Sequence, residues 1–501
     1  IETHISCVLL AGEHAYKLKK PLDLGFLDFS TLEKRRACCE EELRLNRRLA
    51  PDLYLAVVPV TGSLEHPRIG GPLEPGDSVL EWAVHMRRFS QEDLLDRRRL
   101  KPETVDLLAE RLAAFHGEIP RAPADSPYGT PDAVLRPMVE NIAQVRARIR
   151  LPEHAGRLEQ IEAWTHARWR ELTPILETRR EEGRVRECHG DMHRGNIALV
   201  EGRLVIFDAL EFNPALRWID TASELAFLIM DLEEAGEMPS AWRLLNRYLE
   251  LSGDYGALQV LDFYKVYRAM VRAKVLAIRL GQADLSPVEA GADRRECAGY
   301  LAQAASYTRR RRPRLLIACG LSGSGKSRLG RRLREVLPLI HLRSDVERKR
   351  LFGLDPEART THAPGCGIYF PQATEWTYER LHRLASLILR SGYDVLVDAT
   401  FLNRARRSLF RRLAQTQGAG FAILVLDAPM EILRQRVVRR LGEGCDASEA
   451  SLAVLEHQRA RCECLDDTER ALAFKIDSAA PPSLEEVLTA IESLSGIPRD
   501  A

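Results

Sequence analysis

Apolar and polar residues alternate at the start of the chain as they do in short β-strands. The segments Ser6–Leu10 and Ala15–Lys19 flank a short turn, which predicts a β-hairpin. A helical pattern then covers Thr31–Leu49, and two further strand-like runs cover Val57–Thr61 and Ser78–Met86. We therefore expect a strand-rich first lobe, over about residues 1–88.

From about Gln91 onward the pattern becomes mostly helical. The exceptions are two short strands, Ile197–Val200 and Leu204–Phe207. A strand-rich lobe followed by a helical lobe, at about residues 89–307, predicts a two-lobed α+β domain over residues 1–307.

A different rhythm begins beyond Pro313. Strand-like runs alternate with helical segments, which is typical of βαβ units with a parallel sheet. The predicted strands are Arg314–Cys319, Leu339–Leu342, Asp394–Asp398 and Ala422–Asp427. We expect an α/β domain at residues 314–501. The arginines and proline of Arg309–Pro313 favour a basic linker at residues 308–313.

Composition agrees with an ordinary globular protein of at least two domains. The chain has 501 residues, 45% hydrophobic and 29% charged, with 73 basic residues against 72 acidic residues. This balance excludes a polycation that binds nucleic acid through its overall field. The sequence has ten cysteines, and none of them forms a CxxC pair. Together with the lack of a long apolar run or a signal segment, this predicts a cytoplasmic protein with reduced thiols. A start at Ile1 rather than Met suggests that a natural N-terminal piece precedes it.

A phosphate-binding motif opens the second domain. The string from Gly320 to Ser327 fits GxxxxGK[ST] between an apolar strand and the helical run Arg328–Val336. Its backbone N–H groups would cradle phosphates, Lys326 would reach the β- and γ-phosphates, and Ser327 would bind Mg²⁺. The remaining candidate nucleotide-binding residues are Gly320, Ser322, Gly323, Ser324 and Gly325.

Polar residues follow the later strands of this domain. Asp345 follows the second strand, Asp398 ends the third, and Arg436 and Arg440 precede a stretch from Asp446 that could fold over the site. Over residues 314–480 the sequence resembles P-loop kinases related to zeta toxins, gluconate kinase and polynucleotide 5′-kinase.

That resemblance implies a role for each of these residues. Asp345 would accept the proton of the acceptor hydroxyl, and Asp398 would hold Mg²⁺ as the Walker B acid. Arg436 and Arg440 would be lid arginines that neutralise the transferring phosphoryl group. Asp345 could instead cap a helix, and the arginines could lie on a helix surface. Three weaker candidates for holding the acceptor are Arg343, Arg348 and Arg404.

The first domain contains a second set of kinase-type residues. His189, Asp191 and Asn196 are spaced as HxDxxxxN, and the following strand pair ends at Asp208. A loop aspartate can align a hydroxyl, while an asparagine and a second aspartate supply the oxygen ligands that Mg²⁺ prefers.

Here the sequence resembles aminoglycoside and choline kinases and the wider protein-kinase-like fold, over roughly residues 5–300. The resemblance implies Asp191 as catalytic base, Asn196 and Asp208 as Mg²⁺ ligands, and His189 as an organiser of the loop. Glu211 is either a metal or supporting residue or a simple surface acid.

The nucleotide end of this domain is defined less sharply. Ala15-Tyr16-Lys17 resembles the kinase strand whose lysine binds the α- and β-phosphates, with Lys19 as the alternative. The partner would be Glu42, or else Glu41. No GxGxxG precedes this strand, a departure that leaves the phosphate grip of that loop open. We expect the adenine-binding hinge within Glu81–Met86.

One feature of the first domain bears on the charge of its acceptor. The helix predicted over Tyr264–Leu280 carries Arg268 and Arg272 near one face, which would favour an anionic acceptor over an aminoglycoside. Asp220 and Glu224 could instead be structural or face an amine.

Three functions remain open on these residues. The first is a bifunctional kinase that uses ATP or GTP with Mg²⁺ and phosphorylates the hydroxyl of a small metabolite. The second is a nucleotide-sensing protein with one inactive domain. The third is a nucleic-acid 5′-hydroxyl kinase, kept open by the basic linker.

Overall fold

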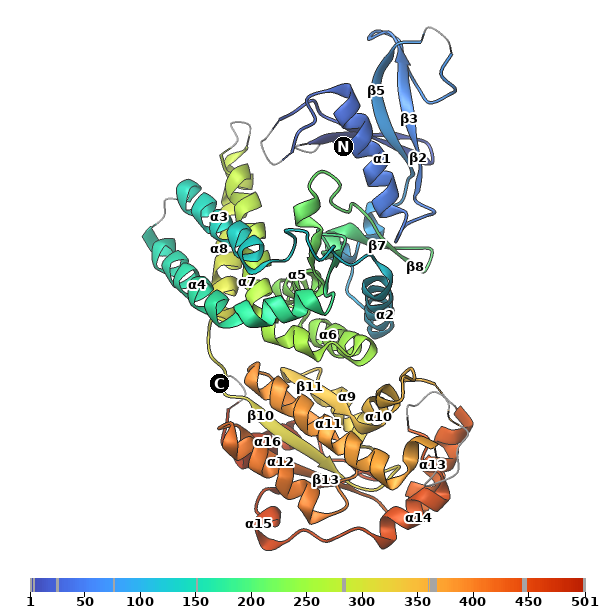
Figure 1. Cartoon of the computed structure of the whole chain (residues 1–501), viewed down its shortest axis with the longest axis vertical. Helices are drawn as coiled ribbons and strands as arrows, with labels where there is room; N and C mark the ends of the chain where they lie inside the picture. Colours follow the sequence, from blue (N-terminus) through green and yellow to red (C-terminus); the bar gives the residue numbers. More distant parts are fainter. Residues whose placement is uncertain are drawn as a thin grey trace. The chain divides into compact units, whose positions relative to one another are not determined.

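The computed structural model describes residues 2, 5–23, 27–74, 77–149, 152–281, 285–358, 360, 367–443 and 448–498. The chain divides into two compact units (Figure 1). The N-terminal unit comprises Ile1–Glu237 and Leu261–Tyr307, and the C-terminal unit comprises Met238–Val260 and Thr308–Ala501. The C-terminal unit resumes at Thr308, and residues 238–260, which the sequence pattern assigned to the first domain, group with it.

The first lobe of the N-terminal unit is a five-stranded antiparallel sheet. Its strands, in spatial order, are β1 (Ser6–Ala11), β2 (His14–Lys19), β5 (Val79–Arg87), β3 (Tyr54–Gly62) and β4 (Pro67–Ile69). The predicted hairpin is present, with Ala11 opposite His14 at its turn. Helix α1 (Leu32–Asn46) begins after Thr31, whose hydroxyl accepts the N–H of Lys34.

The second lobe is helical. Its helices are α2 (Pro102–Glu118), α3 (Pro131–Arg148), α4 (Pro152–Glu181), α5 (Thr221–Glu234), α7 (Leu258–Arg279) and α8 (Pro287–Tyr307). Buried apolar side chains of α3, α4, α5, α7 and α8 form one core. Two short antiparallel strand pairs interrupt the helices. The hairpin of β7 (Ile197–Val200) and β8 (Arg203–Ile206) was predicted, whereas the pair of β6 (Val185–Glu187) and β9 (Trp218–Asp220) was missed by the sequence pattern.

The C-terminal unit is an α/β fold with a parallel sheet, as expected. Its strands, in spatial order, are β11 (Leu339–Arg343), β12 (Asp394–Asp398), β10 (Arg314–Cys319), β13 (Gly420–Asp427) and β14 (Ala473–Asp477). The strand β14 was not predicted. The helices are α9 (Lys326–Leu333), α10 (Ser344–Leu351), α11 (Pro371–Arg390), α12 (Arg404–Thr416), α13 (Met430–Glu443), α14 (Leu452–Ala460), α15 (Asp467–Arg470) and α16 (Leu484–Ser495).

Helix α6 (Met238–Ser252) covers the edge strand of this sheet. The amide of Asn246 donates to the carbonyl of Leu339 at 2.9 Å and accepts the N–H of His341 at 2.8 Å. An edge strand has unpaired backbone groups, so a side chain that satisfies two of them ties α6 to β11. These contacts explain why residues 238–260 group with the C-terminal unit.

Across the described ranges, each helix is either too short or too polar to serve as a transmembrane span.

Candidate active sites

Lys17 and Glu42 form an ion pair in the N-terminal unit. Lys17 lies on β2 and Glu42 on α1, and the ammonium donates to Glu42 Oε1 at 2.9 Å. Burial opposes the charge of Lys17, but Asp208 and Glu42 raise its pKa well above the ordinary value. This is the contact expected from the sequence. The alternative partner, Glu41, instead binds Arg44 and Arg217.

Lys19 lies deeper in the same cluster. Its side chain is fully buried and donates to Glu42 Oε2 and to Glu211 Oε1. Glu211 is therefore buried and is not a surface acid. Burial raises the pKa of Glu211, and Lys19 opposes that effect. Lys19 therefore joins two buried carboxylates, while Lys17 reaches toward Asp208.

The loop between β6 and β7 holds Asp191 and Asn196 together. The amide nitrogen of Asn196 donates to the Asp191 carbonyl at 2.9 Å and to Asp191 Oδ2 at 3.1 Å. This use of the nitrogen leaves the amide oxygen of Asn196 as its ligand atom. Burial alone would raise the pKa of Asp191, but His193, 3.5 Å away, and His189 hold it below its usual range. Asp191 is therefore a carboxylate at neutral pH.

Asp208 has an unusual backbone conformation for an aspartate. Its φ is 65°, in the left-handed region, and it follows β8. The Asp208 N–H donates to the hydroxyl of Tyr54 at 3.2 Å, and Lys17 lies 2.5 Å from Asp208 Oδ1. The side chain is 44% exposed. These contacts present the carboxylate toward Lys17.

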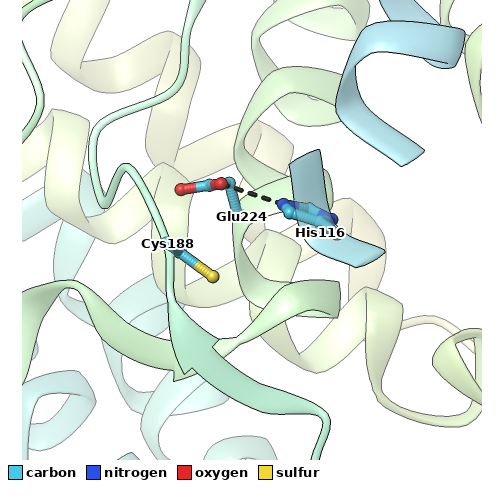
Figure 2. Close-up of side chains that lie close together, drawn as sticks. All are labelled: His116, Cys188 and Glu224. Atoms are coloured by element: carbon cyan, nitrogen blue, oxygen red, sulfur yellow. Dashed lines mark hydrogen bonds and ion pairs between the residues drawn. The ribbon is translucent and has the colours of Figure 1, made fainter. Parts of the chain in front are cut away.

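Buried polar groups brace the loop that carries Asp191. Glu224 Oε1 accepts the N–H of Gly190 at 2.7 Å, and Glu224 Oε2 contacts His116 Nε2 at 2.9 Å (Figure 2). His189 donates through Nε2 to the carbonyl of Phe207, and its Nδ1 accepts the N–H of Asp191. This agrees with the organising role expected for His189.

Cys188 lies beside this brace, and its sulfur lies within 4.8 Å of the ligand atoms of His116 and Glu224 (Figure 2). Burial raises the pKa of the Cys188 thiol well above its ordinary value, and the thiol donates to the Ile219 carbonyl at 3.5 Å. The contacts of Glu224 and Cys188 are therefore structural. Asp220 is structural as well, because Arg179 binds both of its oxygens at 2.7 and 2.8 Å.

The expected adenine-binding hinge, residues 81–86, lies in the central strand β5, which pairs with β2 on one side and with β3 on the other. Residues 83–86 have partners on both strands, whereas Glu81 and Trp82 pair with β3. Just beyond the strand, the N–H of Arg88 donates to the carbonyl of Glu13 at 2.8 Å. The position of the hinge stays a prediction.

The two arginines of α7 predicted to face the acceptor, Arg268 and Arg272, do not form a free basic face. Arg268 is buried and donates to the carbonyls of Gly190 at 3.0 Å and Ser223 at 3.2 Å. Arg272 donates to the hydroxyl of Tyr300 at 3.3 Å. The contacts of Arg268 make it a support of the Asp191 loop, so the basis for an anionic acceptor in this unit is removed.

In the C-terminal unit, three glycines of the phosphate loop have positive φ: Gly320 (152°), Gly323 (82°) and Gly325 (90°). A Cβ at Gly320 would lie 2.3 Å from the carbonyl oxygen of Leu426, so only glycine fits there. Lys326 begins α9 and donates to the carbonyls of Gly320 and Leu321 at 2.9 and 3.0 Å. Burial lowers the pKa of Lys326, whereas Asp398 and Asp345 oppose that shift.

Ser327, Asp398 and His341 form a chain of hydrogen bonds beside Lys326. The hydroxyl of Ser327 donates to Asp398 Oδ2 at 2.6 Å, and His341 Nε2 lies 3.2 Å from the same oxygen. Burial would raise the pKa of Asp398, but neighbouring groups lower it below its ordinary value. The hydrogen bond with His341 is the largest of these lowering effects. His341 had no signature in the sequence, since a lone histidine in a strand is usually a core residue.

A cavity of about 920 Å³ joins the phosphate loop to Asp345. Asp345 lies in the first turn of α10, whose N-cap is Arg343, so Asp345 is not the helix cap. Arginines dominate the charged lining: Arg328, Arg331, Arg332, Arg348, Arg406, Arg436, Arg439, Arg440 and Arg461. The cavity therefore suits phosphate groups and other anions.

The predicted arginines of this unit divide into two groups. Arg348, Arg436 and Arg440 line the cavity, and Arg436 donates to the carbonyl of Gly323 at 3.3 Å. Arg343 instead pairs with Glu250 of α6 at 3.2 Å, and Arg404 is 57% exposed and pairs with Asp466 at 3.4 Å.

Arg406 also lines the cavity, as does Asn403, the N-cap of α12. The sequence pattern did not single out Arg406. The stretch proposed to fold over the site begins at Asp446, outside the described residues, while Ser448 and Glu449 line the cavity.

The comparisons agree with both halves. Residues 28–261 match the profile of a phosphotransferase enzyme family, and residues 315–465 match a profile described as an AAA domain. The uncharacterized protein Rv2004c of Mycobacterium tuberculosis is 31% identical over 489 residues, which are 96% of this chain and 92% of that protein. An adenylyl-sulfate kinase of Myxococcus xanthus is 33% identical over 127 residues, 25% of this chain and 64% of that enzyme.

Two solved structures illustrate the spread of the similarity. Amicoumacin kinase hAmiN, in complex with AMP-PNP, Ca²⁺ and Ami, has a TM-score of 0.36 and 12% identity and covers 60% of this chain and 89% of its own. The APS kinase CysC of Mycobacterium tuberculosis, in complex with AMPPNP and APS, has a TM-score of 0.27 and 22% identity and covers 37% of this chain and 98% of its own.

Fold and sequence together define a kinase in which an aminoglycoside-phosphotransferase-like domain precedes a P-loop kinase domain. The chain belongs to the same family as the mycobacterial protein Rv2004c.

Proposed function

We propose that the protein is a bifunctional kinase in which each domain transfers the γ-phosphoryl group of ATP or GTP to a hydroxyl of a small molecule. The observation that supports this most strongly is that both sites retain a complete set of groups. Lys17, Asp191 and Asp208 lie in one unit, and Lys326 and Asp398 lie in the other.

The donor atoms fit Mg²⁺ in both units. In the N-terminal unit the carboxylate of Asp208 and the amide oxygen of Asn196 would hold it. In the C-terminal unit the hydroxyl of Ser327 and the carboxylate of Asp398 would do so. Bound Mg²⁺ would neutralise charge on the triphosphate.

In the N-terminal unit, Asp191 orients the acceptor hydroxyl and receives its proton. The acceptor oxygen forms a bond to the γ-phosphorus while the bond to the bridging oxygen breaks, and the nucleoside diphosphate leaves. Lys17, held by Glu42, binds the α- and β-phosphates. His189 and Glu224 keep the loop of Asp191 in place.

In the C-terminal unit, Asp345 has the role of Asp191, and Lys326 holds the phosphates. Arg436 and Arg440 stabilise the charge on the transferring phosphoryl group. The acceptor of this unit is an anion with a hydroxyl, because Arg348, on the same helix as Asp345, and Arg406 of α12 line the cavity. The similarity to an adenylyl-sulfate kinase supports that class of acceptor.

A nucleic-acid end kinase is the weaker alternative. Of the linker arginines, Arg312 donates to the carbonyl of Gly418 at 3.1 Å, so one of these cations binds the protein itself. Binding of an oligonucleotide that weakens steeply with salt would favour this alternative.

The test is a metabolite-pool screen with γ-labelled ATP. Wild type is compared with Asp191→Asn, Lys326→Ala and the double variant, each with Mg²⁺ and with a chelator. We expect one labelled product to disappear only with Asp191→Asn and another only with Lys326→Ala, and both to disappear with the chelator. Bound nucleotide without any labelled product would contradict the proposal and favour a sensing protein. A product lost in one variant alone, with no second product, would refute bifunctionality.

A further inference from the structure

A small pocket in the helical lobe of the N-terminal unit is lined by aromatic rings. It has a volume of about 110 Å³, and residues of α3, β9 and α7 line it. The rings of Tyr128 and Trp218 stack in it, with centroids 5.8 Å apart and planes 8° apart. Tyr264 and Tyr267 of α7 add a second aromatic side. Aromatic faces of this kind bind flat, apolar faces of other rings.

Three observations place this pocket against the loop that carries Asp191. Leu216 lines the pocket, and its carbonyl oxygen would lie 2.9 Å from a Cβ built on Gly190. Ser223 also lines the pocket and accepts from Arg268, which binds the carbonyl of Gly190. The charge of Asp191 contributes to raising the pKa of Tyr267, although burial is the main cause.

The pocket carries almost no net charge of its own. Among the described lining residues only Arg136 and Asp220 are ionic. Arg179 binds both oxygens of Asp220, and Arg136 is exposed at the rim. An anion would therefore gain little in the interior, whereas a neutral ring loses much less hydration free energy than an ion does when it leaves water.

Tyr264 adds a polar group that the fold itself does not use. The side chain is buried, with an exposed fraction of 3% for the residue, and it lines the pocket. Within the described part of the chain its hydroxyl has no hydrogen-bond partner. The hydroxyl is not among the buried polar atoms that lack a partner, so it is open to the pocket rather than sealed from water. A ligand hydroxyl that enters the pocket can therefore form a hydrogen bond with it.

From these features we infer that the pocket binds the acceptor of the N-terminal kinase site, and that this acceptor is a neutral, hydroxyl-bearing six-membered ring. Tyr128 and Trp218 contact the face of the ring, and Tyr264 pairs with one of its hydroxyls. Another hydroxyl extends toward Asp191. A sugar ring and a phenolic ring share this chemistry. The inference rests on the proposed function of this site and specifies its substrate class.

The test measures ring binding apart from phosphoryl transfer. Saturation-transfer NMR on the full-length chain, with Mg²⁺ and AMPPNP, is recorded with three probes: glucose, phenol and acyclic glycerol 3-phosphate. The variants are Trp218→Leu and Tyr264→Phe, and Trp376→Phe in the C-terminal unit is the matched aromatic control. Thermal melting of each variant identifies any that fail to fold, and Tyr264→Phe removes only one hydroxyl.

We expect glucose or phenol to bind, and the one that binds identifies the type of ring. Trp218→Leu should weaken binding about 3- to 10-fold, and Tyr264→Phe about 2- to 10-fold, while Trp376→Phe leaves it unchanged. The inference is overturned if neither ring binds, or if binding survives both pocket variants in folded protein. It is equally overturned if glycerol 3-phosphate binds and the same substitutions abolish that binding.

The two proposals fail separately. Asp191-dependent transfer without ring binding would refute the pocket assignment alone. Ring binding that depends on Trp218, without any Asp191-dependent transfer, would refute the kinase proposal for this unit and leave the pocket as a binding site.

Discussion

The ammonium nitrogen of Lys17 lies 2.9 Å from Glu42 Oε1, on a helix that begins after the hairpin carrying Lys17. Glu42 has a second cation, since Lys19 donates to its other oxygen. The two lysines are two positions apart on one face of β2, yet their surroundings differ. Lys17 also contacts the partly exposed Asp208, whereas Lys19 is enclosed by Glu42 and Glu211.

This difference predicts separate effects for two similar substitutions. Lys17→Met should lower the Asp191-dependent kcat/KM about 100- to 1000-fold with little loss of stability, because Glu42 keeps Lys19. Lys19→Met leaves buried carboxylates without their shared cation and should destabilise the N-terminal unit by about 3–5 kcal/mol. Urea unfolding and steady-state turnover of both variants check this. Equal effects of the two variants on stability and on turnover would contradict the division of roles.

A second prediction concerns the base of the C-terminal unit. Asp345→Asn should lower Lys326-dependent transfer about 100- to 10,000-fold while nucleotide binding persists, because Asp345 lines the cavity from α10 and is not part of the phosphate loop. Arg404→Ala is the control, since Arg404 is 57% exposed and pairs with Asp466. Single-turnover kinetics and nucleotide titrations measure the two effects. Loss of transfer in Arg404→Ala, or its retention in Asp345→Asn, would count against the assignment.

A third prediction concerns the close contact between Gly330 and His341. A Cβ at Gly330 would lie 2.4 Å from the His341 imidazole, which contacts Asp398. Gly330→Ala should therefore displace His341 and weaken Mg²⁺ binding at the C-terminal site about 10- to 100-fold. A Cβ at Gly299 on α8 meets nothing within 4 Å, so Gly299→Ala is the matched control. The Mg²⁺ dependence of Lys326-dependent transfer is the measurement, and an unshifted curve for Gly330→Ala would refute the role of His341.

A fourth prediction follows from the pKa of His189, which burial lowers from the ordinary 6.5. As pH falls, the unfolded chain takes up this proton first. The stabilisation is therefore present above about pH 6.5 and is lost as pH falls through the lowered pKa. Protonation of Nδ1 also removes the acceptor for the Asp191 N–H. Melting temperature between pH 7.5 and 5 should fall more steeply for wild type than for His189→Gln; parallel curves would show that His189 does not titrate there.

Much of the fold was accessible from local patterns. Turn residues between two alternating segments predicted the hairpin β1–β2 and the strand pair β7–β8. Glycine spacing predicted the phosphate loop. The strands β6 and β9 were missed because three-residue strands carry no measurable alternation. The partner of β11 was missed for another reason: Asn246 is distant in sequence and no periodicity marks its contact.

The site residues divide along similar lines. Asp191, Asn196 and Asp208 were identified because their spacing is set by one loop and one hairpin. Arg268 was misinterpreted because a helical face of cations does not reveal whether backbone carbonyls lie against it. The sequence pattern found the strand at residues 81–86 without showing that β2 and β3 pair with it.

The central claim, two separate nucleotide sites in one chain, is tested most directly by calorimetric titration of the full-length protein with AMPPNP and Mg²⁺. The account predicts two nucleotides bound per wild-type chain, one for Lys17→Met, one for Lys326→Ala and none for the double variant. A wild-type chain that binds a single nucleotide, or a double variant that still binds one, would contradict it.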